Sequence, residues 1–339
     1  MILFLKWMIV ASIFFLWQQT RVFGPYDYVL PKSFPYVNRE RKKEMNNTRV
    51  SVVIPAYNAG GHIARAISSV RASEIERIIV VDDGSTDGTG DIAEKLGCRV
   101  VRQDNRGAAL ARIAGLAETT TELVIFLDAD DELVPHGVGQ LADHIQENAE
   151  LFGVHGRSLC VASDGSNKYM GGWSEGITLT SLLNRGISPG PAGSFVWRVA
   201  ALRLAIESNV PALWPRFGED YEMLLRVAMK GRIAQQATVI CKYTLSGGKS
   251  AVSPFRDNVA AERVKRYYAA SNGISIRKRG LSEIKSMGHL RDAYALSSNA
   301  DFFLKIHHIL TAVFLSPLLF PRLILRRVKR QLRFSRNPT

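Results

Sequence analysis

Short apolar runs alternate with amphipathic segments between residues 50 and 128. Four of the runs are rich in β-branched residues, and three of them are followed directly by proline or aspartate, as buried strands commonly are. The segments between the runs repeat apolar residues at helical spacing. The pattern predicts the order β-α-β-α-β-α-β, and hence an α/β fold with a Rossmann-like, mostly parallel sheet flanked by helices. The expected strands are residues 50–54, 78–81, 98–101 and 123–127, and the expected helices are residues 63–70, 91–96 and 108–117.

The second half of the chain has a less regular pattern. No internal repeat or low-complexity linker separates it from the first half, so we expect one continuous α/β domain. Strand-like runs occupy residues 153–162, 194–197 and 233–243, and helical runs occupy residues 202–207, 221–229, 257–270 and 283–297.

Charge is distributed unevenly along the chain. The 44 lysine and arginine residues exceed the 31 aspartate and glutamate residues, which gives a net charge of +13. Residues 50–301 contain 28 residues of each sign, and the whole excess lies in residues 1–49 and 302–339. An enzyme acting on nucleic acid would be expected to carry basic residues on its folded core. The distribution therefore favours an anionic membrane surface as a partner and disfavours nucleic acid.

The N-terminal extension, residues 1–49, has three interpretations: a membrane anchor, a signal-peptide core, which no small-residue cleavage site follows, and an error in the gene start. Its uninterrupted apolar run, residues 7–17, is shorter than the roughly 20 residues that a spanning helix needs, so it is a marginal membrane anchor at best. If it spans, the basic residues that follow predict that the rest of the protein stays in the cytoplasm. Alternatively, translation starts near Met45, because residues 18–44 show no helix or strand period, and the preceding segment is an error in the gene start.

The C-terminal tail has the pattern of a helix that lies on a membrane. Residues 309–321 are apolar but contain Pro317 and Pro321, which makes them a poor span. Cationic and apolar residues then alternate from Arg322 to Arg336, as in helices that bind anionic headgroups. A tail helix packed on its own domain is the alternative. Together with three well-separated cysteines, which indicate a reducing compartment, this predicts the cytoplasmic face of the inner or plasma membrane, in a bacterium.

Acidic residues follow the expected strands at one edge of the sheet, where parallel α/β folds bind ligands. Asp128 and Asp130 come directly after the fourth strand, and alternate residues of an extended segment face the same way. Two close carboxylates repel each other unless a cation lies between them, so we expect a divalent cation, Mn²⁺ or Mg²⁺, at this position. Helix capping is the alternative interpretation of the same residues.

Two further acidic motifs complete the candidate chemistry. Asp82 and Asp83 begin a tight turn into a helix, where a carboxylate can accept hydrogen bonds from a base or ribose or can cap the turn. Asp220 precedes a helical run and is a candidate general base or an N-cap. The chain contains neither a dinucleotide-binding glycine motif nor a P-loop, so a metal would have to neutralise a bound phosphate.

These motifs, in this order and spacing, resemble the family 2 glycosyltransferases. The resemblance is specific over residues 50–131 and extends to about residue 250. It implies a GT-A fold, a nucleotide-sugar donor and inversion at the anomeric carbon. It rests on Val50-Ser-Val-Val-Ile-Pro-Ala-Tyr-Asn58, Val81-Asp-Asp-Gly-Ser-Thr-Asp-Gly-Thr89, Asn105-Arg-Gly107 with Ala111-Arg112, Phe126-Leu-Asp-Ala-Asp-Asp131, and Gly218-Glu-Asp220.

The resemblance assigns roles to residues of this chain. Asp83 would bind the base, Asp130 would lie nearest the metal with Asp128 beside it, and Asp220 would be the general base on the acceptor. Residues 50–131 would form the nucleotide-sugar-binding half, residues 132–255 the acceptor-binding half, and residues 256–339 a helical region with a membrane-associating tail. The other residues expected to bind the nucleotide sugar are Pro55, Tyr57, Asn58, Asp82 and Arg112.

Departures from the family pattern limit these assignments. The histidine that many members carry after the base helix is missing from the segment 242–250, which leaves a third metal ligand in doubt, although Lys249 or Ser250 could contact the diphosphate. The chain contains neither a Gln-x-x-Arg-Trp motif nor a segment of several membrane spans. The sequence therefore disfavours a processive polymer synthase. Trp173, Trp197 and Trp214 lie in the expected acceptor half, where one of them could stack on a sugar.

The favoured hypothesis is an inverting, metal-dependent hexosyl- or N-acetylhexosaminyltransferase. It would use a UDP- or GDP-sugar and a glycan or lipid-linked acceptor in cell-surface polysaccharide biosynthesis. One alternative is a nucleotidyltransferase that activates a sugar phosphate, although the segment 57–61 lacks the basic residue of its glycine-rich loop. The other is a membrane-bound protein that binds nucleotide sugars without catalysis.

Overall fold

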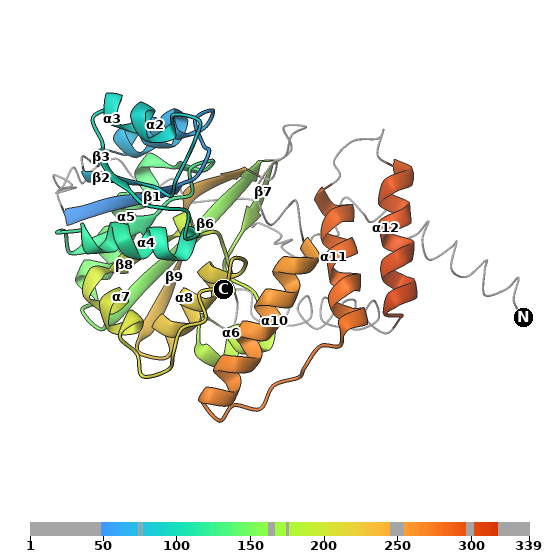
Figure 1. Cartoon of the computed structure of the whole chain (residues 1–339). Helices are drawn as coiled ribbons and strands as arrows, with labels where there is room; N and C mark the ends of the chain where they lie inside the picture. The colour runs from blue at the N-terminus through green and yellow to red at the C-terminus, as the bar shows by residue number, and fades with distance from the viewer. Residues whose placement is uncertain are drawn as a thin grey trace, which may run out of the picture.

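A computed structural model describes residues 49–73, 75, 77–161, 167–173, 176–244, 254–295 and 302–317. Nine strands form one sheet in the order β3-β2-β1-β4-β8-β6-β9-β5, with β7 paired to β6 (Figure 1). Helices flank the sheet on both faces, which confirms the expected α/β class. The N-terminal residues 1–48 and the tail 318–339 lie outside the described residues, and so do the predictions made for them.

The first half of the sheet is parallel, as the alternating pattern predicts. Strand β1 pairs with both β2 and β4, and β2 pairs with β3, all in parallel register. Helices α2, α3 and α4 are the crossovers between consecutive strands. The elements are β1 (Val50–Ala56), α2 (Ile63–Ala72), β2 (Arg77–Asp82), α3 (Thr89–Lys95), β3 (Arg99–Arg102), α4 (Ala108–Ala117) and β4 (Leu123–Phe126).

The second half of the sheet is mixed. Strand β8 pairs antiparallel with β4 and with β6, while β6 and β9 run parallel. All three strand-like runs and all four helical runs expected there are present. The elements are β5 (Glu132–Leu133), α5 (Pro135–Glu147), β6 (Leu151–Val161), β7 (Asn167–Met170), α6 (Leu179–Arg185), η3 (Ala192–Ser194), β8 (Phe195–Arg198), α7 (Val199–Ile206), α8 (Glu219–Ala228), β9 (Arg232–Thr244), α10 (Pro254–Ser271), α11 (Leu281–Ala295) and α12 (Phe302–Leu315).

Alternating side chains of the parallel strands enter two separate hydrophobic cores. In β1, Val52 and Ile54 enter the core that α2, α3 and α5 cover, whereas Val53 enters the core on the opposite face. That second core is covered by α4, α6, α7, α8 and α10. Because both faces are covered, the strands consist of nearly continuous apolar runs.

Close packing of α4 on the sheet places its side chains near the strand ends. Gly115 faces β1, and a Cβ at this position would lie 2.3 Å from Cγ1 of Val53. Such a distance is far shorter than a normal carbon contact, so only glycine permits this approach of helix and strand. Arg112 lies one turn before Gly115 on the same face of α4, which carries its side chain to the carboxyl edge of the sheet.

The C-terminal helices extend away from the sheet. Helix α10 packs on the second core through Val264 and Tyr268. Helices α11 and α12 lie side by side beyond it (Figure 1). Helix α12 begins at Phe302, seven residues before the apolar segment that the sequence indicated, and ends at Leu315, just before Pro317. Among the described helices, none has the length and apolar content needed to cross a bilayer.

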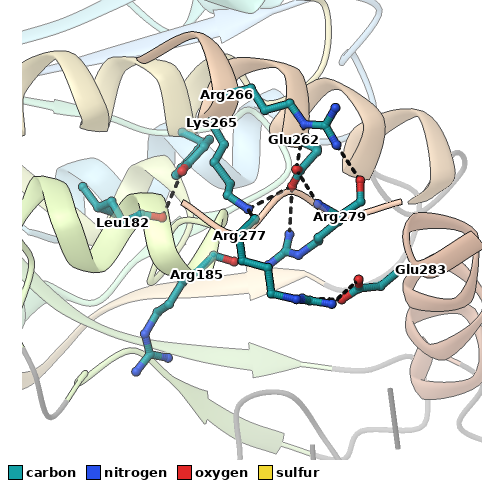
Figure 2. A network of polar contacts seen from close by, with 9 residues as sticks. Leu182, Arg185, Glu262, Lys265, Arg266, Arg277, Arg279 and Glu283 are labelled. Carbon is teal, nitrogen blue, oxygen red and sulfur yellow. Dashed lines mark hydrogen bonds and ion pairs between the residues drawn. The ribbon is translucent and has the colours of Figure 1, made fainter. Parts of the chain in front are cut away.

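A buried carboxylate fixes the link between α10 and α11. Glu262 accepts hydrogen bonds from Lys265 Nζ at 3.1 Å, Arg266 Nε at 3.0 Å and the backbone N–H of Arg279 at 2.9 Å (Figure 2). Since Glu262 is almost fully buried, these donors are needed to offset the loss of its hydration. The network ties the segment after α10 back onto that helix.

Candidate active site

The loops that follow β1 and β2 are joined by hydrogen bonds. The backbone N–H of Asn58 donates to Ser85 Oγ at 3.0 Å, and the Asn58 side-chain oxygen accepts from the backbone N–H of Thr86 at 2.9 Å. Asn58 has φ of 49°, in the left-handed region that asparagine tolerates better than most residues. Asn58 therefore shapes the edge of the candidate site. Tyr57 beside it is 44% exposed and presents its ring to solvent, while Pro55 is half-buried within β1.

The two aspartates after β2 order the neighbouring backbone. Asp82 accepts a hydrogen bond from the backbone N–H of Ser85 at 2.9 Å. Asp83 accepts from Gln103 Nε2 at 2.7 Å and from the backbone N–H groups of Arg106 and Gly107, each at 2.8 Å. Both carboxylates are buried. Asp83 thus holds the loop between β3 and α4 in place, and its Oδ2 atom, which accepts from the Gly107 N–H, has capacity for another hydrogen bond.

Arg112 connects the two halves of the domain. Its Nη2 atom lies 2.7 Å from Asp128 Oδ1, at the end of β4, and its Nη1 atom lies 3.2 Å from Glu219 Oε1, at the start of α8. The guanidinium is buried, which disfavours its charge, but Asp128, Glu219 and Asp220 outweigh this cost and raise the pKa of Arg112. The sequence predicted that Arg112 contacts a diphosphate. In this structure, Arg112 instead bridges the carboxylates of Asp128 and Glu219.

The acidic residues after β4 repel one another. Burial, followed by the charge of Asp128, raises the pKa of Asp130. Asp131 is fully buried, and burial followed by the charges of Asp128 and Asp130 raises its pKa well above the ordinary value. Asp131 Oδ1 accepts from the backbone N–H of Thr244 at 3.1 Å, whereas its Oδ2 atom has no partner among the described residues.

This arrangement fits a divalent cation. Asp128 keeps 34% of its side chain exposed despite the ion pair with Arg112, so it remains accessible to a ligand. A cation bound by Asp128 and Asp130 would relieve the repulsion that raises the pKa of Asp130. Within the described part of the chain, no third histidine, cysteine or carboxylate completes a metal-binding group with these two, so donor phosphate and water would supply the other ligands.

Asp220 lies in the first turn of α8, next to Glu219 and near Arg112. Gly218, with φ of 73°, turns the chain into the helix, and the backbone N–H of Tyr221 donates to Asp220 Oδ1 at 2.7 Å. Burial and the neighbouring Glu219 raise the pKa of Asp220 to about 7, against the opposing effect of Arg112. A carboxyl group with this pKa can accept a proton near neutral pH, which suits a general base.

A pocket joins Asp220 to the aromatic residues of the second half. Arg112, Glu219, Asp220, Trp197 and Trp214 all line it. Trp197 is nevertheless almost fully buried and stacks on Phe195 with ring centroids 4.8 Å apart, and Trp173 is buried as well. Of the three tryptophans that the sequence singled out, Trp214 is the one left half-exposed at the pocket.

A network that sequence reasoning missed holds Trp214 in place. Glu222, fully buried in α8, accepts hydrogen bonds from the backbone N–H groups of Leu213 and Trp214, each at 2.7 Å. Tyr268 of α10 donates to the same carboxylate at 2.6 Å. Trp214 has φ of 38°, a strained value for a tryptophan, and these bonds oppose its relaxation. Glu219, the second partner of Arg112, was also missed, because nothing in the local sequence distinguishes it from a helix-start carboxylate.

Comparisons with known proteins agree with this geometry. Residues 51–188 match the family model described as Glycosyl transferase family 2. The succinoglycan biosynthesis protein ExoU of Rhizobium meliloti (strain 1021) is 30% identical over 286 residues, covering 75% of this chain and 79% of ExoU. The putative teichuronic acid biosynthesis glycosyltransferase TuaG of Bacillus subtilis (strain 168) is 37% identical over 125 residues, which are 34% of this chain and 49% of TuaG.

The fold has counterparts among solved structures. The S. aureus TarS fragment 1–349 in complex with UDP-GlcNAc superposes with a TM-score of 0.53 at 19% identity, covering 78% of this chain and 79% of that one. This likeness confirms the GT-A fold expected from the motifs. With the family model and the extended match to ExoU, it leads to one conclusion: the chain belongs to the family 2 glycosyltransferases.

Proposed function

We propose that this glycosyltransferase moves a hexosyl or N-acetylhexosaminyl group, with inversion, from a UDP- or GDP-sugar to a hydroxyl of a glycan or lipid-linked acceptor in cell-surface polysaccharide biosynthesis. The names of ExoU and TuaG, both biosynthesis proteins of bacterial polysaccharides, support the pathway class. The complex of TarS with UDP-GlcNAc supports a UDP-sugar donor and makes UDP-GlcNAc the first one to test.

The observation that carries the proposal is the link that Arg112 makes between Asp128 and the start of α8, where Asp220 lies. Arg112 contacts Asp128 and Glu219 at once, so the start of α8 is held against the end of β4. Arg112 and Asp220, whose pKa is raised to about 7, line one pocket, and Arg112 links that pocket to Asp128, the candidate metal ligand. An inverting displacement needs one base on the side of the acceptor and charge neutralisation on the side of the leaving diphosphate.

Each group then has one part in the reaction. Pro55, Tyr57, Asn58, Asp82 and Asp83 border the place where the nucleoside would bind. Asp128 and Asp130 would hold a divalent cation, which when bound neutralises charge on the diphosphate. Asp220 takes the proton of the acceptor hydroxyl while the hydroxyl oxygen forms a bond to the anomeric carbon. The bond from that carbon to the nucleoside diphosphate breaks at the same time.

The alternatives differ in what they require. A nucleotidyltransferase would form a new bond at phosphorus and would not need a base positioned beside the acceptor sugar. A non-catalytic binder would not need Asp220 in its buried position, whose raised pKa reflects an energetic cost to the folded protein at neutral pH. Neither alternative therefore explains the position of Asp220, whereas sugar transfer to a hydroxyl does.

Metal dependence provides the first test of the proposed function. Release of UDP from UDP-GlcNAc should require Mn²⁺ or Mg²⁺, and EDTA should abolish it. Asp130→Asn should lower the rate by about 100-fold or more, because charge neutralisation of the leaving group is lost. A UDP-release assay across a panel of UDP- and GDP-sugars measures both effects. Full activity in EDTA would show that the metal assignment is wrong.

Asp220 provides the second test. Asp220→Asn keeps an oxygen that can accept from the Tyr221 N–H but cannot take a proton, so transfer should fall by about 10²- to 10⁴-fold. Binding of UDP-GlcNAc with Mn²⁺, measured by calorimetry, should stay within a few-fold of the wild type. Because the base must be ionised, wild-type kcat should decline as pH falls through about 7. Unchanged transfer in the variant would refute the assignment.

We further propose that the basic C-terminal tail binds the cytoplasmic face of a bacterial membrane, where a lipid-linked acceptor is presented. The support is the sequence pattern alone: seven of the eight basic residues in the segment 302–339 follow Pro317. The same segment contains no acidic residue to offset them.

Shortening the chain tests this location. A variant ending at Pro317 retains α12 and should move from the membrane to the soluble fraction, and it should lose binding to vesicles containing anionic lipid. A full-length variant with the seven basic residues changed to glutamine separates charge from chain length. Membrane association that persists in both variants would contradict the proposal.

A further inference from the structure

Helices α11 and α12 bring three potential metal ligands together, far along the chain from the catalytic motifs. His289 and Asp292 lie three residues apart in α11, so they share one face of that helix. His308 comes from α12. Its Nδ1 atom lies 3.0 Å from His289 Nδ1 and 3.7 Å from Asp292 Oδ2. All three ligand atoms lie within 4.8 Å of one another.

These distances suit a tetrahedral metal centre. Zn²⁺ binds imidazole nitrogen and carboxylate oxygen at about 2.0–2.2 Å, which separates tetrahedral ligands by about 3.3–3.5 Å. The observed separations of 3.0 and 3.7 Å lie on either side of that value. Small rotations of the side chains would therefore be enough to place all three ligands around one ion.

The kinds of ligand also indicate which metal would bind. Two imidazoles and one carboxylate suit zinc and its neighbours in the first transition row, whereas Mg²⁺ prefers oxygen ligands alone. All three side chains are partly buried, so water can reach a fourth position. Within the described part of the chain, this is the one group of three such residues whose ligand atoms meet.

The protonation state of the group is compatible with metal binding. Burial, and then the neighbouring His308, lowers the pKa of His289, while Asp292 opposes this effect. A neutral imidazole is the form that binds a metal. Without a metal, one Nδ1–H would have to donate to the other ring, and this pair of histidines is the alternative that the experiment must separate.

We propose that His289, Asp292 and His308 form a structural Zn²⁺ site that fastens α12 to α11. Another polar contact between the helices is the hydrogen bond from Ser286 Oγ to the backbone oxygen of Ala312 at 2.8 Å. A metal bound by both helices would add a second attachment, near the place where the chain continues into the basic tail. The proposal is independent of the sugar donor and acceptor.

Cobalt provides a spectroscopic test on the full-length protein, with any affinity tag removed and bound metal stripped by chelator. Titration with Co²⁺ in excess Mg²⁺ should produce the visible absorption of tetrahedral cobalt, and Zn²⁺ should displace it at a stoichiometry of one per chain. His308→Ala should weaken Co²⁺ binding by more than the 10- to 100-fold that loss of an outer-shell partner typically causes.

Matched variants make the result specific. His307→Ala changes an exposed histidine next to His308 and should leave the spectrum intact. Asp130→Asn should also leave it intact, because the catalytic carboxylates are not the ligands. His289→Gln is the second loss variant if His308→Ala does not fold, as judged by circular dichroism. No tetrahedral band in the wild type, or a band lost in Asp130→Asn and kept in His308→Ala, would overturn the proposal.

Discussion

The buried ion pairs of Arg112 hold the candidate active site together. One guanidinium contacts a carboxylate from the end of β4 and another from the start of α8, two elements separated by more than 90 residues of chain. Such a pair is costly to desolvate, and it persists because both partners are present in good geometry. Replacing Arg112 with a neutral residue would leave Asp128 and Glu219 without the cation that pairs with them. The relative position of the two halves of the site therefore depends on this one side chain.

The same arrangement explains how a core with balanced charge can bind an anionic donor. Asp128, Glu219 and Asp220 lie around Arg112, and Asp130 and Asp131 lie near Asp128. Burial, followed by the charge of a neighbouring carboxylate, raises the pKa of Asp130, Asp131 and Asp220. A divalent cation is the natural complement to this excess. The net charge of +13 arises from residues 1–49 and 302–339, outside the segment that contains these acids.

Much of the parallel half could be predicted from the sequence, because buried parallel strands form apolar runs bounded by turn residues. The expected strands at residues 50–54 and 78–81 lie inside β1 and β2. Helix α5 was missed because two glycines and two histidines interrupt its apolar pattern. The strands β5 and β7 were missed because they have only two and four residues, too few to show a period.

The site was predictable where it follows strand ends and was not where it depends on tertiary contacts. The position of Asp128 and Asp130 follows from local spacing. The pairing of Arg112 with Glu219, the hold of Glu222 on Trp214, and the meeting of His289 with His308 all join residues from different elements. No local pattern encodes such contacts, because they arise only when the helices have packed.

The central claim is that Arg112 lies close enough to Asp220 for its charge to oppose the rise in the pKa of Asp220 that burial and Glu219 cause. The direct measurement is the pH dependence of kcat for UDP release in Arg112→Gln and Arg112→Lys. Arg112 lowers the pKa of Asp220, so its loss in the glutamine variant should move the acid limb of the profile to higher pH. Lysine should keep the limb close to the wild-type position near 7. A limb that stays unchanged in Arg112→Gln would contradict the account.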